Sequence, residues 1–367
     1  MSTTGDTAQQ AAASLVEDLE ELVLCESFSS DLEAVARSAK VVAAMGTRHL
    51  GTAPEFLVID GVTHLRWSFG TPRVLLLGHH DTVWPIGTLA THPWSLVDGV
   101  ARGPGVFDMK AGLVQTFHAL AGLASLDGIT LLITGDEEVG SLTSSPLIQD
   151  TARGLAATFV MEASADGGAL KTARKGTSNY TVNVHGKAAH AGLEPEKGAN
   201  AGIELAHQIL AVAAMGTGAT TVTPTVLSGG TSFNTVPAAA SVGVDVRVAE
   251  VSEQTRVDAA MHALRPVVPG TRLEILGGPN RPPLESSMSA GLFTLAQELA
   301  VGLGLGPLTS ASVGGASDGN FTAGVGCPTL DGLGAVGGGA HADHEHVVVA
   351  EMPGRVALLR ALIEAVR

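Results

Sequence analysis

Histidines and carboxylates recur in this sequence where apolar runs end. The run 74–77 (VLLL) is followed by a glycine and then by His79, His80 and Asp81. Four aliphatic residues closed by a glycine predict a buried parallel strand, and in open α/β sheets the chemistry collects at the carboxyl ends of such strands. We therefore expect His79 and Asp81 to project into a crevice, where a carboxylate can fix the tautomer of a metal-binding imidazole. A solvated strand end explains the same short pattern, because His-x-Asp is a weak motif.

A second informative stretch, residues 103–112, combines a glycine-rich loop with one carboxylate. Asp108 stands just before the helical pattern of residues 111–126. An N-cap is the ordinary role of an aspartate at this place. Capping alone does not require the tight glycines upstream, whereas a bridge between metals would. The Walker spacing is absent, so these glycines do not form a phosphate loop.

Two further strands end in carboxylates. The buried run 129–134 (ITLLIT) leads into three adjacent acids that include Glu137 and Glu138, and the predicted strand 157–161 leads into Glu162. Adjacent acids after a buried strand are costly unless water solvates them or a cation neutralises them. A solvated turn and a metal site both remain open for these residues.

The strand-end residues share nitrogen and oxygen donors and include no thiolate. Such a set suits two zinc ions about 3.5 Å apart that share one carboxylate, with one histidine and two carboxylates around each metal and one position left for water. Glu137 then remains beside the metals without binding them, as required of a general base that deprotonates metal-bound water. The candidate ligands are His79, Asp108, Glu138, Glu162 and His341, the last of which follows the glycines 337–339.

Length and composition set the broad class. With 367 residues the chain exceeds one typical domain, and 45% hydrophobic residues can bury a sizeable core. The net charge of −15 argues against nucleic acids and anionic membranes as partners. No apolar run approaches the roughly 20 residues that span a bilayer, and no signal peptide is evident at the N-terminus. We expect a soluble cytoplasmic protein whose two cysteines, Cys25 and Cys327, form no disulfide framework.

These motifs together resemble the M20 family of co-catalytic zinc peptidases, and within it the glutamate carboxypeptidases of the carboxypeptidase G type. They follow the order of the family and span nearly the whole chain. The matching segments are 78–83 (GHHDTV), 103–110 (GPGVFDMK), 136–141 (DEEVGS), Glu162, 187–192 (KAAHAG), 234–237 (NTVP), 245–247 (DVR), and His341 with Glu345.

The resemblance implies a role for each candidate. Two Zn²⁺ ions per subunit are expected, with Co²⁺ or Mn²⁺ as substitutes. Asp81 orients the first histidine, Glu137 is the base, and a cis peptide bond joins Asp108 to Met109. The implied ligands are His79 and Glu162 for one zinc, Glu138 and His341 for the other, and Asp108 as the bridge between them.

The resemblance also implies an α/β fold with two domains. Residues 1–177 and 282–367 are expected to form the catalytic domain, with a mixed central sheet flanked by helices. Residues 178–281 are expected to form an inserted, ferredoxin-like α/β sandwich that dimerises and acts as a lid. Helices are expected at 8–24, 31–50, 201–215, 253–264, 289–302 and 352–366, and strands of the insertion at 180–184 and 241–248.

The inserted domain is expected to contact the substrate. By the resemblance, His190 stabilises the oxyanion in the active site of the partner subunit of a homodimer. Arg247 would grip a substrate carboxylate and Asn234 would hold the same end, although Arg247 also fits an exposed charge on a sheet. This points to an acylated amino acid or a short peptide as the substrate. Residues 171–176 depart from the segment that recognises glutamate in the G-type enzymes, so a preference for glutamate does not follow.

Three functions are compatible with these residues. The first is a dizinc carboxypeptidase that cleaves an amide bond next to a free carboxylate, with metal-bound water activated by Glu137. The second is an N-acyl-amino-acid amidohydrolase (aminoacylase) or a ureido-acid hydrolase with nearly the same metal motifs. The third, a catalytically silent zinc-dependent binding protein, is expected where the base or a ligand is lost. Every one of those residues is present, which favours an enzyme.

Overall fold

The computed structural model describes residues 3–367, with side chains from residue 12 onward, and the chain divides into two compact units. Unit 2 comprises Arg174–Glu285 and Gly314–Ala316, and unit 1 comprises the rest of the described chain. Unit 2 extends beyond residues 178–281 at both ends, because Arg174 and Leu284 pair through an isolated β-bridge just outside its first and last strands.

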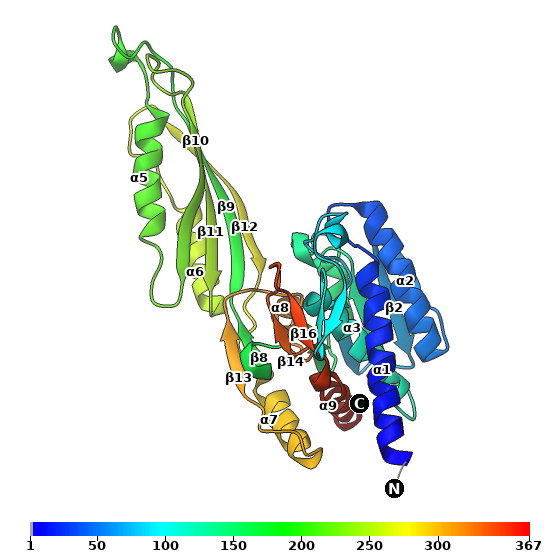
Figure 1. Cartoon of the computed structure of the whole chain (residues 1–367). Coiled ribbons are helices and arrows are strands. Elements are labelled where there is room, and N and C mark those ends of the chain that lie inside the picture. The colour runs from blue at the N-terminus through cyan, green and yellow to red at the C-terminus, as the bar shows by residue number, and fades with distance from the viewer. Residues whose placement is uncertain (1–2) are drawn as a thin grey trace. The chain divides into compact units, whose positions relative to one another are not determined.

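Unit 1 is built on a six-stranded mixed sheet (Figure 1). Its strands in spatial order are β1 (Glu55–Ile59), β2 (Val62–Phe69), β6 (Ile129–Thr134), β3 (Val74–His79), β7 (Ala157–Val160) and β14 (Thr329–Leu330). The last four run parallel to one another, and β1 and β2 form an antiparallel edge. Strands β3 and β6 are buried on both faces, which explains their unbroken apolar sequences.

Helices cover both faces of this sheet. Leu76 faces the larger core, and Leu75 and Leu77 face the smaller one, as the two-residue period of a strand requires. The larger core includes side chains of α1 (Thr3–Leu24), α2 (Leu32–Leu50), α3 (Ala111–Ala121), α7 (Ser286–Gly302) and α9 (Met352–Val366), and the smaller one includes side chains of α4 (Ser145–Ala152) and α8 (Gly319–Gly324).

Two of these helices show how local sequence sets their ends. Asp31 caps α2 by accepting a hydrogen bond from the Ala34 N–H at 2.9 Å, and Gly51 ends α2 with a left-handed φ of 72°. The helix predicted at 111–126 ends at Ala121, so that expectation is too long by five residues. The segment that follows begins with Gly122 and then turns toward β6.

A small antiparallel sheet brings two loops of unit 1 together. Strand β16 (His346–Val348) pairs with β5 (Val100–Arg102), and β15 (Gly337–Gly338) and β4 (Ser95–Val97) lie outside them. The loop that follows β5 and the loop that precedes β16 therefore lie side by side. A two-stranded sheet of β8 (Leu170–Arg174) and β13 (Ser310–Val313) also belongs to unit 1, apart from Arg174, with which unit 2 begins.

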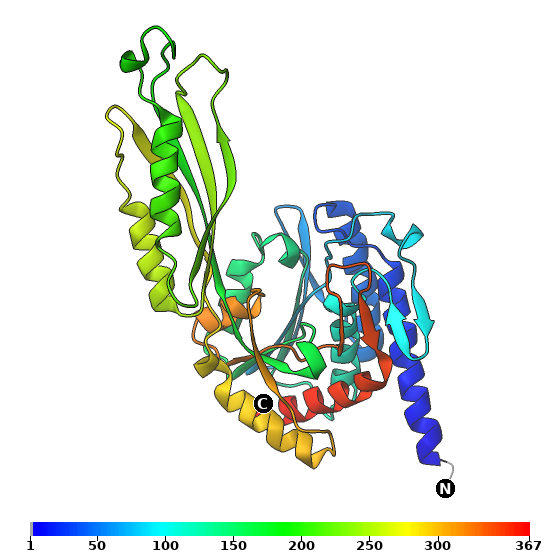
Figure 2. The same cartoon turned by 60° about the vertical axis from the view of Figure 1, so that its left-hand side comes forward.

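Unit 2 has the ferredoxin-like order of elements. Its four strands form one antiparallel sheet in the order β10-β11-β9-β12, and Figure 2 shows both helices on the same face. Alternate residues of β9 and β11 fill the core beneath these helices. In chain order the elements are β9 (Gly176–His185), α5 (Ala201–Ala213), β10 (Thr221–Gly229), β11 (Ala239–Val248), α6 (Val251–His262) and β12 (Arg272–Arg281).

The described part of the chain contains no helix with both the length and the apolar character needed to cross a bilayer. Cys25 and Cys327 are both free cysteines, the first partly buried and the second buried.

Candidate metal centre

Three adjacent strands of unit 1 deliver one side of the site. Strand β3 lies between β6 and β7 and runs parallel to both, so their carboxyl ends meet at one edge of the sheet. His79 ends β3, Glu137 and Glu138 lie in a short turn after β6, and Glu162 follows β7 shortly after its end. The buried apolar strands thus bring these four side chains together, as the sequence pattern predicted for strand ends.

His79 directs one nitrogen at two carboxylates. Its Nε2 lies 3.3 Å from Asp108 Oδ1 and 3.5 Å from Glu162 Oε1. Its Nδ1 lies 3.0 Å from the backbone oxygen of Asp81 and 3.5 Å from Oδ1 of the same residue. An Nδ1–H that donates to the Asp81 carbonyl leaves the lone pair of Nε2 facing the carboxylates. The main chain of Asp81 is therefore a nearer partner of the imidazole than its carboxylate.

The carboxylate of Asp81 holds the neighbouring turn. It accepts hydrogen bonds from Ser29 Oγ at 2.7 Å and from the backbone N–H groups of Glu137 and Glu138 at 3.2 and 3.3 Å. Burial opposes ionisation, but His79 and Ser29 outweigh it and hold the pKa of Asp81 below its usual range. Asp81 thus joins the end of β3 to the turn that carries both glutamates. Sequence reasoning missed Ser29, which had no signal beyond its place near a helix start.

Each carboxylate oxygen of Asp108 lies near a different imidazole. Asp108 lies in the turn Val106–Lys110, and the bond to Met109 is cis, as the resemblance implied. Its φ of −115° and ψ of 96° are not helical, and Lys110 occupies the N-cap of α3. Asp108 Oδ1 lies 3.3 Å from His79 Nε2, and Oδ2 lies 3.4 Å from His341 Nε2. The N-cap interpretation of Asp108 is therefore wrong.

His341 and Glu138 form the other side of the site. His341 Nε2 lies 3.1 and 3.2 Å from the two carboxylate oxygens of Glu138. The histidine lies in the loop before β16 and adopts a left-handed φ of 62°, which costs a non-glycine residue free energy and recurs at functional sites. Its side chain is about half exposed, so this side of the site is open to solvent.

Glu345 fixes the loop that carries Asp108. This fully buried carboxylate accepts hydrogen bonds from Trp84 Nε1 at 2.8 Å and from the backbone N–H groups of Gly105, Phe107 and Asp108 at 3.0, 2.8 and 3.0 Å. The sequence placed Glu345 in a motif with His341 but assigned it no role. Its position four residues after a candidate ligand was the one signal that could have singled it out.

The buried polar atoms fit a bound cation. Nε2 of His79 and Oδ1 of Asp108 face each other at 3.3 Å, and neither has a hydrogen-bond partner of acceptable geometry. The negative carboxylates favour positive charge at this site, because contacts with Asp108 and Glu138 raise the pKa of His341 to about 10. Burial, together with the charge of Asp108, raises the pKa of Glu138 to about 7. Imidazole and carboxylate donors without thiolate suit Zn²⁺, Co²⁺ or Mn²⁺.

Glu137 lies beside this donor set and is largely buried. One carboxylate oxygen of Glu137 lies within 4.8 Å of donor atoms of both His79 and Glu162. A second group within the same limit shares His79 with the first and consists of His79, Asp108 and Glu138. The two adjacent glutamates therefore belong to different groups of donor atoms.

In unit 2, His190 and Asn234 come together although 44 positions separate them in the sequence (234 − 190). The N–H of Ala191 donates to the backbone oxygen of Asn234 at 2.9 Å, and His190 forms an isolated bridge with Thr235. Nδ1 of His190 accepts the backbone N–H of Gly192 at 3.2 Å and lies 3.2 Å from the N–H of the next residue. An accepting Nδ1 leaves the hydrogen on Nε2, so the exposed imidazole presents a donor.

Arg247 lies at the other end of the same sheet. It is near the end of β11, whose first residue, Ala239, follows the Asn234 segment. The eight residue steps of extended strand from Ala239 to Arg247 span about 26 Å. The guanidinium also binds Asp245 through Nε and Nη2, each at 2.9 Å from a carboxylate oxygen. Within one chain, the structure therefore does not bring Arg247 and Asn234 to one end of a small substrate.

Comparison with known families assigns the chain. The model for "Peptidase family M20/M25/M40" matches residues 75–365, which is most of the sequence. The chain belongs to this family. The resemblance inferred from the motifs is confirmed, and this M20 protein is a hydrolase of the peptidase and amidohydrolase kind.

Individual relatives give a finer comparison. Carboxypeptidase G2 from Pseudomonas sp. (strain RS-16) is 29% identical over 95% of this chain and 88% of the relative. Succinyl-diaminopimelate desuccinylase from Wolinella succinogenes is 28% identical over 79% of this chain and 82% of the relative. Among solved structures, Bacillus subtilis YxeP, described as a dinuclear metal binding peptidase, superimposes with a TM-score of 0.67 at 14% identity, covering 96% of this chain and 97% of the other.

Proposed function

We propose that this M20 protein binds two zinc ions and cleaves an amide bond next to a free carboxylate, as a carboxypeptidase of the glutamate carboxypeptidase type. The observation that carries the proposal is the carboxylate of Asp108, whose two oxygens face two different histidines. Each histidine has a further carboxylate of its own, Glu162 for His79 and Glu138 for His341. Such a set of side chains would suit two metal ions that share one carboxylate.

The residues around this centre would divide the chemistry. Bound zinc ions would polarise the scissile carbonyl and acidify water. Glu137, which lies by the same donor atoms, would accept the proton of the attacking water and pass it to the leaving nitrogen. Asp81 would keep Glu137 in place, because its carboxylate holds the backbone N–H of that residue.

Two kinds of amide substrate are supported by different relatives. Similarity to carboxypeptidase G2 favours cleavage that releases a C-terminal amino acid. Similarity to a desuccinylase favours the alternative, hydrolysis of an N-acyl group from an amino acid. The deciding experiment measures kcat/KM for N-acylated amino acids and for dipeptides, with the residue on each side of the amide varied in turn. Zinc-loaded protein that binds these compounds without turnover would instead indicate a silent binding protein.

We further propose that the protein acts as a homodimer in which unit 2 of one chain completes the active site of the other. His190 presents an Nε2–H donor suited to an oxyanion. Arg247 lies about 26 Å along β11 from Ala239, the strand end that follows the Asn234 segment. This favours an arrangement in which the two residues that hold one substrate come from different chains. Strand β10 is an edge of the sheet of unit 2, and Val226 and Leu227 on it are exposed, which suits pairing with a second copy.

Subunit mixing tests this proposal. His190→Ala and Glu137→Gln should each be inactive alone, since loss of an oxyanion donor costs a factor of about 100 to 1,000 in kcat. A heterodimer of the two variants contains one site with both residues intact, so activity should return as subunits exchange. Verified heterodimers that stay as inactive as the parents would show that His190 does not act across the subunit boundary.

A further inference from the structure

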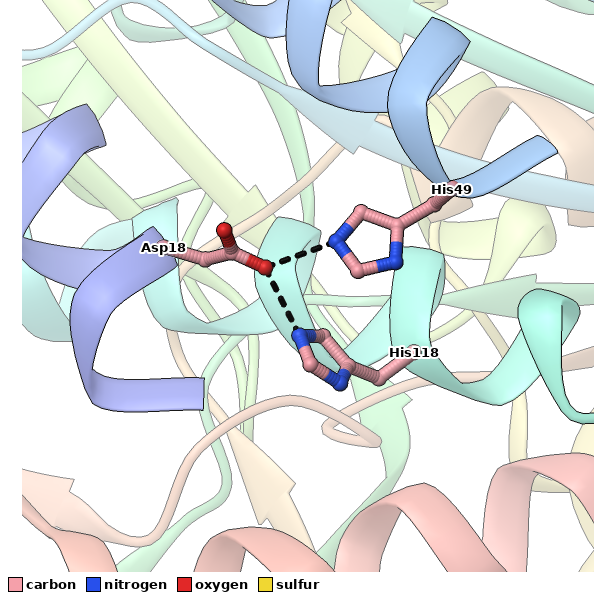
Figure 3. Close-up of side chains that lie close together, drawn as sticks. All are labelled: Asp18, His49 and His118. Carbon is pink, nitrogen blue, oxygen red and sulfur yellow. Dashed lines mark hydrogen bonds and ion pairs between the residues drawn. The ribbon is translucent and has the colours of Figure 1, made fainter. Parts of the chain in front are cut away.

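Unit 1 contains a second cluster of metal-binding side chains that shares no residue with the site described above. Asp18 lies on α1, His49 in the last turn of α2 and His118 in the last turn of α3. His118 is seven residues into α3, which corresponds to about 10 Å along the helix from its start beside Asp108. Figure 3 shows both imidazoles turned toward one carboxylate.

The three donor atoms converge on one point. Asp18 Oδ2 lies 2.7 Å from Nε2 of His49 and 2.8 Å from Nε2 of His118. The other oxygen of Asp18 is held by Arg48 Nη2 at 2.8 Å, which leaves Oδ2 directed at the histidines. The side chains of the triad are 9 to 15% exposed, so they are shielded but reachable from solvent. Two imidazoles and a carboxylate with coordination positions left for water form a common donor set for zinc.

The electrostatics of this place favour a cation. The last turns of α2 and α3 both contribute a ligand, and the carboxyl end of a helix carries a partial negative charge. Arg48 balances only one of the two carboxylates it touches, since it also binds Glu21 at 2.8 Å. Burial opposes ionisation of Asp18, but bonds from His118, Arg48 and His49 outweigh it and hold the pKa of this carboxyl well below its usual range.

We propose that Asp18, His49 and His118 form a separate metal site that binds one zinc ion and ties α1 to α2 and α3. Binding moves the ring hydrogens from Nε2 to Nδ1 and replaces the hydrogen bonds to Oδ2 with coordination. Ligands of a tetrahedral zinc ion lie about 3.3 Å apart, so the donor atoms need to separate by about half an ångström. The proposal does not depend on the reaction catalysed at the paired centre.

Zinc content distinguishes this site from a purely hydrogen-bonded cluster. Asp18→Asn keeps an oxygen that can accept from both histidines but removes the negative charge that favours Zn²⁺ binding. His118→Gln removes one of the three ligands. After dialysis of the full-length protein against the same zinc buffer, atomic emission should find one zinc ion fewer per chain in each variant than in the wild type. His207→Gln, which removes an exposed histidine from α5, is the control and should keep the wild-type content.

Two further measurements keep the test decisive. His79→Ala damages the paired centre and should retain the zinc ion bound by Asp18, His49 and His118. Loss of zinc from one site can therefore be told apart from loss of zinc from the other. Added zinc should raise the melting temperature of His79→Ala and raise it less when Asp18→Asn is combined with it. Equal zinc contents in the wild type and in folded Asp18→Asn would overturn the proposal. An equal zinc-induced rise in melting temperature in His79→Ala and in the double variant His79→Ala, Asp18→Asn would also overturn it.

Discussion

Replacing Glu345 by glutamine tests whether this residue positions the bridging carboxylate. The carboxylate of Glu345 is hydrogen-bonded to one proposed metal ligand, Asp108, and this bond comes from the backbone N–H of Asp108. It nevertheless holds four N–H donors, three of them from the backbone of the loop that carries Asp108. Glu345→Gln keeps the size of the side chain but replaces one accepting oxygen with a donor. We therefore expect the loop to lose its fixed position.

The structure sets the size of the effect. One carboxylate oxygen accepts from Trp84 Nε1 and Gly105 N, and the other accepts from Phe107 N and Asp108 N. In the variant two of these donors face an amide NH₂, and each unsatisfied buried donor costs about 1 to 3 kcal/mol. Burial raises the pKa of Glu345, which means that keeping this carboxylate ionised inside the protein costs free energy. Glutamine carries no charge, so the variant avoids this cost and recovers part of the stability lost with the hydrogen bonds. We expect a net loss of about 2 to 4 kcal/mol of unfolding free energy.

The assay measures stability and metal affinity separately. Urea unfolding of metal-free protein should give the loss of stability. Competition with a zinc chelator should show affinity falling by about 10- to 100-fold, the scale typical of residues that orient metal ligands. Trp84→Phe is the matched control, because it removes one donor to Glu345 and leaves the three backbone bonds in place. It should lose about 1 kcal/mol and keep its zinc affinity. Unchanged affinity in a folded Glu345→Gln protein would refute the positioning role.

Three further outcomes are expected. Glu137→Gln should keep its zinc while turnover falls by at least about a hundredfold, and loss of zinc would show that the roles of Glu137 and Glu138 are exchanged. Chelation should abolish hydrolysis and lower the melting temperature, so full activity in exhaustively metal-free protein would contradict the two-zinc proposal. Burial opposes ionisation of Glu204, but the N–H of Val268 and other hydrogen-bond donors outweigh it and lower the pKa of this carboxyl. The ionised Glu204 therefore stabilises the fold above the ordinary pKa of about 4.3, and this stabilisation is lost as pH falls. Glu204→Gln should therefore be less stable than wild type at pH 7, with a gap in unfolding free energy that narrows below about pH 4.

The sequence alone determined the family, the fold class and the set of candidate ligands. Strands β3, β6 and β7 are short apolar runs without alternation, so their parallel arrangement and burial could be read from composition. Parallel neighbours end at the same edge of a sheet, which is why the sequence alone could group His79, Glu138 and Glu162. The strands β10 and β12 of unit 2 had no comparable signal. They form the edges of their sheet, where the prolines Pro224 and Pro279 are tolerated.

Only the tertiary structure decided how these groups meet. Along the chain Asp108 fitted either a helix cap or a bridge between metals. The two imidazoles at its oxygens come from the end of β3, 29 positions before it, and from a loop 233 positions after it (108 − 79 and 341 − 108). The sequence associated Glu345 with His341 but did not indicate its hydrogen bonds to the loop of Asp108. The cluster of Asp18 with His49 and His118 had no local pattern to indicate it. Periodicity and spacing report the contacts of residues within one element. Contacts between elements depend on how helices and strands pack, and that packing is fixed by the whole core.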